Sequence, residues 1–351
     1  MSDPSIHVAT ESSHEEELQE TPITSRPGLV PLFILCVLTM GVGFFFAMQR
    51  NSSLSDIEVR QDDARADTVW SAKVALEKGA PLELSSVPVS VQQSLDHAVW
   101  GEYRFEQYNQ MTSSQDAQAA SQDAVHTTLS FGVDWREFKS GEGLLGMIKN
   151  SRFQVDSGKQ HLNEQLLRQV QERLNKVTMT ATYHSAGVVD RLSFDADVPP
   201  MMAPVLKLVE GGVVLLSTSL PDKPVLPGAS WTYSVPLAGM EVDTMTMTGQ
   251  VDVTATFKGV LRKDDGQEIQ IISQVLTVSL SGATRDAKVP EQTYSLTGQG
   301  HGLLQLDVES KLPLEHGMVL DTVLVVEPEG GESFTQSSKL QLSYRQGQQG
   351  S

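Results

Sequence analysis

Cysteine and basic residues are scarce in this chain of 351 residues. The single cysteine, Cys36, excludes an intrachain disulfide and any metal site that needs several thiolates. Lysine and arginine number 26 against 44 aspartate and glutamate residues, which gives a net charge of −18. Because nucleic-acid backbones are bound by clustered positive charge, this balance argues against a nucleic-acid partner. An apolar content of 39% is still enough for a sizeable folded core.

Sequence motifs that organise catalysis are also missing. The eight histidines are scattered, and no His-Glu-x-x-His or His-x-His pair offers metal ligands at a helical or strand spacing. No Gly-x-Ser-x-Gly motif presents a serine nucleophile, and the glycines at 298, 300 and 302 do not have the spacing of a dinucleotide-binding loop. We therefore expect a protein that is not an enzyme and that has no catalytic residue, no cofactor and no metal.

One uncharged apolar segment covers residues 28–48. As a helix it would rise about 31 Å, enough to cross a hydrocarbon core of about 30 Å. The preceding segment is acidic, and Leu35 stands before Cys36 where a lipoprotein signal needs a small residue. These features argue against a cleaved leader. We interpret residues 28–48 as a single-pass transmembrane helix that acts as an uncleaved signal anchor.

The rest of the chain divides into four parts. Residues 1–27 are predicted to be an acidic disordered tail, 49–95 a tether, 96–346 a β-rich domain, and 347–351 a flexible C-terminus.

The orientation of the anchor is read from its flanking charges. Arg50, Arg60 and Arg65 follow the span and only Arg26 precedes it, which by itself favours a cytoplasmic C-terminal side. Long C-terminal domains, however, translocate largely regardless of local charge. We therefore expect a cell-membrane protein whose C-terminal domain is extracytoplasmic, either periplasmic or at the cell surface.

Alternation of apolar and polar residues dominates the β-rich domain. Residues 125–135 alternate regularly, and residues 245–261 keep one apolar phase for longer than most strands do. Asp-Asp-Gly at 264–266 predicts a hairpin turn, since the further oxygen ligands of a calcium loop are absent. Residues 161–174 and 200–209 have the apolar spacing of helices. The predicted fold is mainly β (α+β): a large curved antiparallel sheet or half-barrel with one or two packed helices.

Two segments of the domain resemble an uncharacterised family of bacterial envelope β-domain proteins. Residues 220–231 contain its proline-, glycine- and tryptophan-marked entry, and residues 297–307 its Gly-x-Gly strand followed by Asp307. The resemblance covers roughly residues 100–345, implies no catalytic residues, and leaves the anchor and tether as departures from the family pattern. A long-strand meander with a helix on its concave face is also similar, at the level of fold, to periplasmic lipoprotein carriers.

Glycines on the apolar phase of residues 294–308 mark the candidate site. Missing side chains let a sheet bend, let another element pack closely, or leave a recess for an acyl chain, and methionines would give such a recess an adaptable lining. The candidate residues are Met201, Met202, Val205, Met245, Met247, Tyr294, Gly298, Gly300 and Gly302. We expect a membrane-anchored, noncatalytic envelope module that binds an apolar or lipid ligand or an envelope protein. A hydrolase with a dispersed site and a purely structural anchor stay open as alternatives.

Overall fold

The structure is a computed structural model of the chain. It describes residues 82–83, 89–91, 99–113, 125–137, 143–156, 164–183, 189–195, 202–237, 240–242, 245–263, 265–284, 292–328 and 333–347. Within these ranges, no helix has the length and apolar character needed to cross a membrane. The predicted tail, the anchor at 28–48 and most of the tether lie outside the described residues, so they stay predictions.

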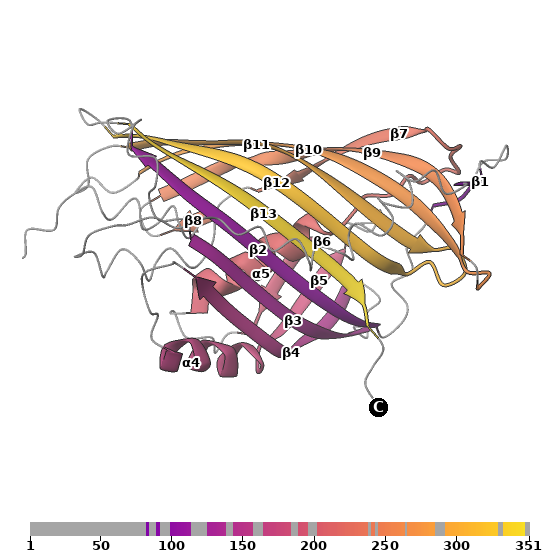
Figure 1. The fold of residues 1–351 in the computed structure, drawn as a ribbon, viewed down its shortest axis with the longest axis horizontal. Coiled ribbons are helices and arrows are strands. Elements are labelled where there is room, and N and C mark those ends of the chain that lie inside the picture. The colour runs from indigo at the N-terminus through magenta and orange to yellow at the C-terminus, as the bar shows by residue number, and fades with distance from the viewer. Residues whose placement is uncertain are drawn as a thin grey trace, which may run out of the picture.

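One antiparallel sheet of thirteen strands forms the domain (Figure 1). The strands are β1 (Leu82–Glu83), β2 (Val99–Ser113), β3 (Val125–Glu137), β4 (Gly143–Asp156), β5 (Thr178–Tyr183), β6 (Val189–Phe194), β7 (Ser230–Pro236), β8 (Met240–Val242), β9 (Met245–Arg262), β10 (Glu268–Thr284), β11 (Gln292–Asp307), β12 (Pro313–Pro328) and β13 (Phe334–Gln346). Eleven of them follow the order β1-β9-β10-β11-β12-β13-β2-β3-β4-β5-β6, and β7 and β8 also pair with β9. Among the described residues β6 and β1 do not pair, so this path does not close on itself. The predicted mainly β, antiparallel fold is confirmed.

The two ends of the domain meet in the middle of the sheet. Strand β13 pairs with β2 over a long antiparallel ladder, from Phe334 opposite Ser113 to Gln346 opposite Gly101. Figure 1 shows the yellow C-terminal strand lying directly beside the indigo N-terminal one. The strands before the helices and the strands after them therefore form one continuous sheet.

Strand β9 shows how far the alternation of the sequence persists. Val251, Val253 and Phe257 are buried on one face, as predicted. Lys258 then forms a bulge, because Ile272 pairs with Phe257 whereas Ile271 pairs with Gly259, which leaves Lys258 without a partner in the ladder. Beyond a bulge the side chains exchange faces.

The bulge in β9 corrects the expectation of a single apolar phase up to residue 261. Val260 packs with the cluster that contains Phe257, whereas Leu261 packs with Ile269 in a separate cluster. Gly259 has φ of 128°, a conformation that glycine adopts at little cost.

Two helices cover parts of the sheet, as predicted. Helix α4 (Glu164–Leu174) packs on β4, and helix α5 (Ala203–Leu215) continues beyond the predicted end at residue 209. Figure 1 shows α5 lying within the curve of the sheet, between β9–β12 on one side and β4–β6 on the other. Val205, Leu206 and Val209 of α5 are buried in the main core cluster. We call the face of the sheet that packs against α5 the inner face, and the opposite face the outer face.

Candidate functional site on the inner face

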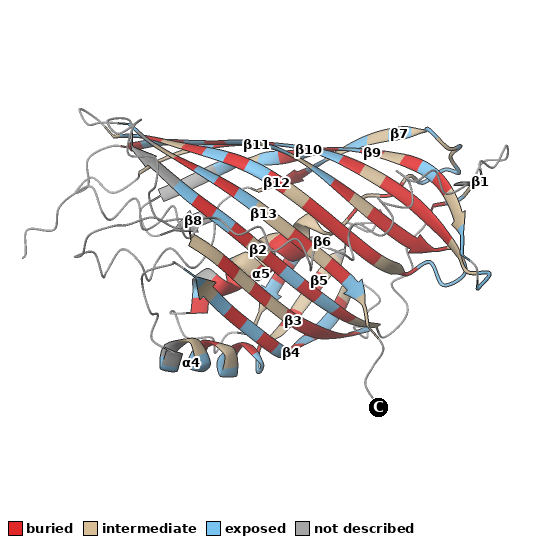
Figure 2. Ribbon diagram, viewed as in Figure 1, coloured by how far each residue is buried: buried red, intermediate tan, exposed pale blue. Residues whose placement is uncertain are grey.

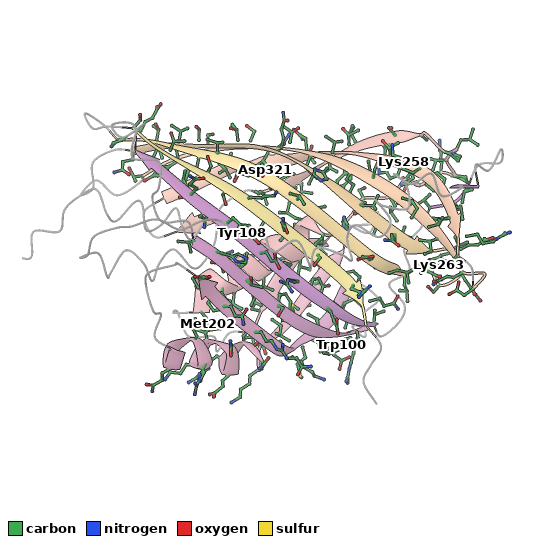
Figure 3. All side chains as sticks on the ribbon, viewed as in Figure 1. Trp100, Tyr108, Met202, Lys258, Lys263 and Asp321 are labelled. Carbon is green, nitrogen blue, oxygen red and sulfur yellow. The ribbon has the colours of Figure 1, made fainter. Side chains whose placement is uncertain are left out.

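No charged side chain is described on the inner face of the sheet. Buried and exposed residues alternate along most strands (Figure 2), and the buried phase contains no Asp, Glu, Lys or Arg among the described side chains of this face. Charged residues such as Lys258 and Asp321 lie in the exposed phase, on the outer face (Figure 3). In a chain with a net charge of −18, the alternation has therefore placed an uncharged surface around α5.

Uncharged polar side chains nevertheless interrupt the apolar inner face. They come from four neighbouring strands, β12, β13, β2 and β3, and we call them the amide-hydroxyl patch: Gln107, Asn109, Thr127, Thr322, Gln336 and Ser338. All six are buried. Gln107 Nε2 donates to Ser338 Oγ at 2.6 Å, and Ser338 Oγ donates to Asn109 Oδ1 at 2.6 Å.

Thr127 differs from the other two hydroxyl side chains of the amide-hydroxyl patch, Thr322 and Ser338, which both donate hydrogen bonds. Its side chain is 1% exposed, and its Oγ1 has no hydrogen-bond partner among the described residues. A buried hydroxyl without a partner costs about 1–3 kcal/mol, so it is an uncommon feature of a folded core.

Of the predicted glycines, Gly298 lies directly beside this patch, because it pairs with Thr322. A Cβ built on Gly298 would lie 2.6 Å from the carbonyl oxygen of Asp321, and one on Gly300 would lie 2.4 Å from the carbonyl oxygen of Val319. Both carbonyls belong to β12, so the missing side chains let the two strands approach closely. At Gly302 the nearest atom is Oε1 of Gln274, at 2.6 Å.

The other predicted site residues are only partly described. Met202 and Val205 are buried at the start of α5, in the same cluster as Tyr294. The Tyr294 hydroxyl donates to Gln292 Oε1 at 2.8 Å, and burial raises the pKa of Tyr294 to about 12.

The remaining three candidates are methionines that cannot be placed on the inner face. Met201 lies outside the described residues. Met245 and Met247 belong to β9, where their backbones pair with Thr284 and Gly282, but their side chains are not described. A methionine lining of the candidate recess therefore stays a prediction.

Reasoning from the sequence missed a buried histidine at the C-terminal end of α5. His316 of β12 is 1% exposed. Its Nδ1 lies 2.7 Å from the carbonyl oxygen of Leu216, the residue that ends α5, and its Nε2 lies 2.7 Å from Gln274 Oε1. Gln274 Nε2 in turn donates to Thr218 Oγ1 at 2.9 Å and to the Tyr233 hydroxyl at 3.1 Å. These contacts attach the end of α5 to β10 and β12.

The protonation of His316 follows from its surroundings. Burial lowers its pKa to about 4, although the bond to the Leu216 carbonyl opposes this shift, so the ring is neutral at pH 7. Nδ1–H then donates to the Leu216 carbonyl. If the assigned oxygen and nitrogen of the Gln274 amide are exchanged by a half-turn, the nitrogen donates to Nε2 and the oxygen accepts from the Thr218 and Tyr233 hydroxyls, which pairs every group.

The sequence does contain a sign of these buried polar groups, namely glutamines at positions where the strand alternation calls for an apolar residue. Gln107 and Gln274 occupy the apolar phase of their strands, where an amide needs partners on other elements. Those partners are 231 and 56 residues away in the sequence, so no local pattern identifies them. Among the described residues, no group of three His, Cys, Asp or Glu side chains is arranged to hold a metal ion.

Comparison with known proteins does not assign the chain to a family. No family model matches it, and no curated protein matches it. OccAB4 of Acinetobacter baumannii shares 7% identity, with 72% of this chain and 99% of that chain covered and a TM-score of 0.18. OccK1 of Pseudomonas aeruginosa shares 6% identity, with 70% and 98% covered and a TM-score of 0.18. A protein from a structure titled "Asymmetric conductivity of engineered proteins" shares 7% identity, with 70% and 100% covered and a TM-score of 0.21.

TM-scores near 0.2 carry no argument about function. The resemblance to an envelope β-domain family likewise gains no support from the family models.

Proposed function

We propose that this protein is a noncatalytic, membrane-anchored envelope module that binds an apolar ligand between the inner face of its sheet and α5. The observation that carries the proposal is the inner face itself. It is apolar over most of its extent, its described side chains carry no formal charge, and α5 lies directly against it. An apolar ligand gains most from a surface of this kind, because its transfer from water is favourable at about 25 cal/mol per Å² buried.

Helix α5 has the properties of a cover that can move. Its N-terminal residue Met202 provides no side-chain cap, and its first turn has no acidic residue. Gly211 and Gly212 are adjacent in the helix, and each lowers intrinsic helix stability by about 1 kcal/mol relative to alanine. The helix therefore depends on its packing, and an apolar ligand that replaces those contacts can displace it.

Both faces of α5 are suited to apolar contact. Val205 and Val209 are buried against the sheet, while Leu208, Val214 and Leu215 are only partly buried. A helix that is apolar on several sides can contact the sheet in one state and a ligand in another.

The predicted anchor supports an envelope location. An uncharged span at 28–48 followed by a tether would hold the β domain near a membrane, which is a source of apolar ligands. The acidic composition also fits a role that does not involve nucleic acid.

Photo-crosslinking tests the proposal on the full chain. Membrane vesicles that contain the protein would be labelled with a long-chain acyl probe carrying a diazirine in its tail, and the labelled residues identified by mass spectrometry. We expect labels on α5 and on inner-face residues such as Phe105 and Leu342, and competition by unlabelled lipid. Labels confined to residues 28–48 or to the outer face would contradict the proposal.

A matched variant makes the test sharper. Gly211→Ala adds a methyl group that meets no atom within 4 Å, so it strengthens α5 without disturbing its packing. If α5 must move to admit the ligand, this variant should lower inner-face labelling. Thr277→Ala, an exposed outer-face change, should leave labelling unaltered.

A further inference from the structure

The amide-hydroxyl patch and the glycines of β11 lie in the same rows across the inner face. One row runs from Gly300 through Leu320, Leu340 and Gln107 to Thr127. The next row runs from Gly298 through Thr322 and Ser338 to Asn109. In the second row Thr322 lies directly beside Gly298. In the first row Leu320 and Leu340 stand between Gly300 and the polar pair Gln107 and Thr127.

An apolar surface borders the patch on the side of α5. Phe105 and Leu342 pair directly with each other in the neighbouring row. Phe105 also contacts α5, because a Cβ built on Gly212 would lie 2.5 Å from its ring. The inner face thus changes from apolar at α5 to hydrogen-bonding at the patch within one row of residues.

We propose that the ligand is a neutral amphiphile, whose uncharged hydrogen-bonding head binds at the amide-hydroxyl patch while its acyl tail lies along Phe105, Leu342 and α5. The proposal rests on the proposed function and specifies the class of ligand. A monoacylglycerol, with an ester and two hydroxyls on an acyl chain, has this chemistry.

Because the described inner face has no charged side chain, the head group of the ligand is expected to be uncharged. A buried carboxylate, phosphate or ammonium would need an opposite charge nearby, and the described side chains of this face offer none. Amides and hydroxyls can instead donate to and accept from a neutral ester or hydroxyl.

Thr127 provides an independent observation in favour of a ligand. Its hydroxyl is buried and unpaired among the described residues, although every other hydroxyl in the patch has a partner. A ligand hydroxyl or ester oxygen at this position would give it one. A core that served only for packing would be more stable with valine, which has the same shape and no polar group.

Three probes with the same diazirine-bearing tail test the proposal on the full chain in membrane vesicles. One carries a glycerol ester, one a free carboxylate and one an amine. We expect the glycerol ester to label the inner face at least tenfold more efficiently than either charged probe. Equal labelling by all three, or a preference for a charged head, would overturn the neutral-head assignment while leaving apolar binding intact. A failure of all three to label the inner face would instead overturn the proposed function.

Paired valine variants locate the head. Thr127→Val should lose most of the preference for the glycerol ester without a fall in melting temperature, because it removes an unpaired hydroxyl and keeps the shape. Thr277→Val makes the same chemical change on the exposed outer face and should retain the preference. If Thr127→Val and a second variant, Ser338→Ala, both keep the preference, the head does not bind at the patch and the assignment is wrong.

Discussion

His316 shows how one residue can join a helix to a sheet. Its ring is held between the last carbonyl of α5 and the Gln274 side chain, away from water. A neutral histidine performs this role, whereas an imidazolium would need to be solvated. The folded protein therefore binds a proton at this ring less readily than the unfolded chain does.

The low pKa of His316 makes the stability of the fold depend on pH. The pKa of His316 is about 4 in the fold and about 6.5 in an unfolded chain, so stability should fall as pH decreases from about 6.5 towards 4. The slope from this group can reach about 1.4 kcal/mol per pH unit. Urea unfolding of the full chain in detergent between pH 5.0 and 6.5 measures it.

Two histidine variants separate this effect from the titration of other groups. His316→Asn should be less stable at pH 7 and should have a flatter pH profile over the same interval. His301→Asn makes the same substitution on the exposed phase of β11 and serves as the comparison. An unchanged slope in His316→Asn would show that other groups cause the pH dependence.

At the scale of single elements, α5 contains two adjacent glycines with opposite surroundings. A Cβ on Gly211 meets nothing within 4 Å, whereas a Cβ on Gly212 would lie 2.5 Å from the Phe105 ring. Gly211→Ala should therefore stabilise the domain by about 0.5–1 kcal/mol through helix propensity. Gly212→Ala should destabilise it by about 1–3 kcal/mol through overpacking. Thermal unfolding of the two variants beside the wild type checks both signs, and equal shifts would contradict the packing of α5 on β2.

Strand β11 allows a second test at this scale. Gly300→Leu would place a side chain 2.4 Å from a β12 carbonyl, so we expect a loss of about 1–3 kcal/mol in the free energy of unfolding. Thr297→Leu, in the exposed phase of the same strand, should change stability by less than about 0.5 kcal/mol. A tolerated leucine that abolishes labelling by an acyl probe would instead mean that Gly300 lines an open recess.

The sequence predicts elements better than it predicts their contacts. Alternation identified β3 and most of β9, and helical spacing identified both helices, because these patterns are local. Strands β4 (Gly143–Asp156) and β7 (Ser230–Pro236) were not predicted. The bulge at Lys258 was not predicted. Apolar residues stand at both 260 and 261, so the sequence is compatible with either alternation of faces at this end of β9. Asp307, noted as part of a family pattern, accepts hydrogen bonds from the backbone N–H and hydroxyl of Ser310, so its contacts fix the turn between β11 and β12.

The same holds for the candidate site: residues close in the sequence were predicted together, but their neighbours on other strands were not. The glycines of β11 were identified as a group, but their neighbours on β12 depend on strand register. The amide-hydroxyl patch depends on β13 lying beside β2, which no local pattern encodes.

At the scale of the whole molecule, the orientation in the membrane is the main prediction. In a Cys36→Ala background, single cysteines would replace Ser12 in the acidic tail and Ser337 in an exposed position of β13. An impermeant maleimide added to intact cells with a permeable outer layer should label residue 337 and not residue 12. Labelling of residue 12 alone would place the β domain in the cytoplasm.

The ladder between β2 and β13 also sets the order in which the protein can fold. The Gln107 and Ser338 side chains that meet across it are 231 residues apart, so their loop must close late and slowly. Until β13 has been synthesised, β2 and β12 each present an unpaired edge, and a nascent chain stopped before residue 334 would expose both to other chains. Synthesis must therefore pass β13 before the sheet can be completed. If the domain is exported, as predicted, the delay keeps the chain open enough to be threaded across a membrane before it folds.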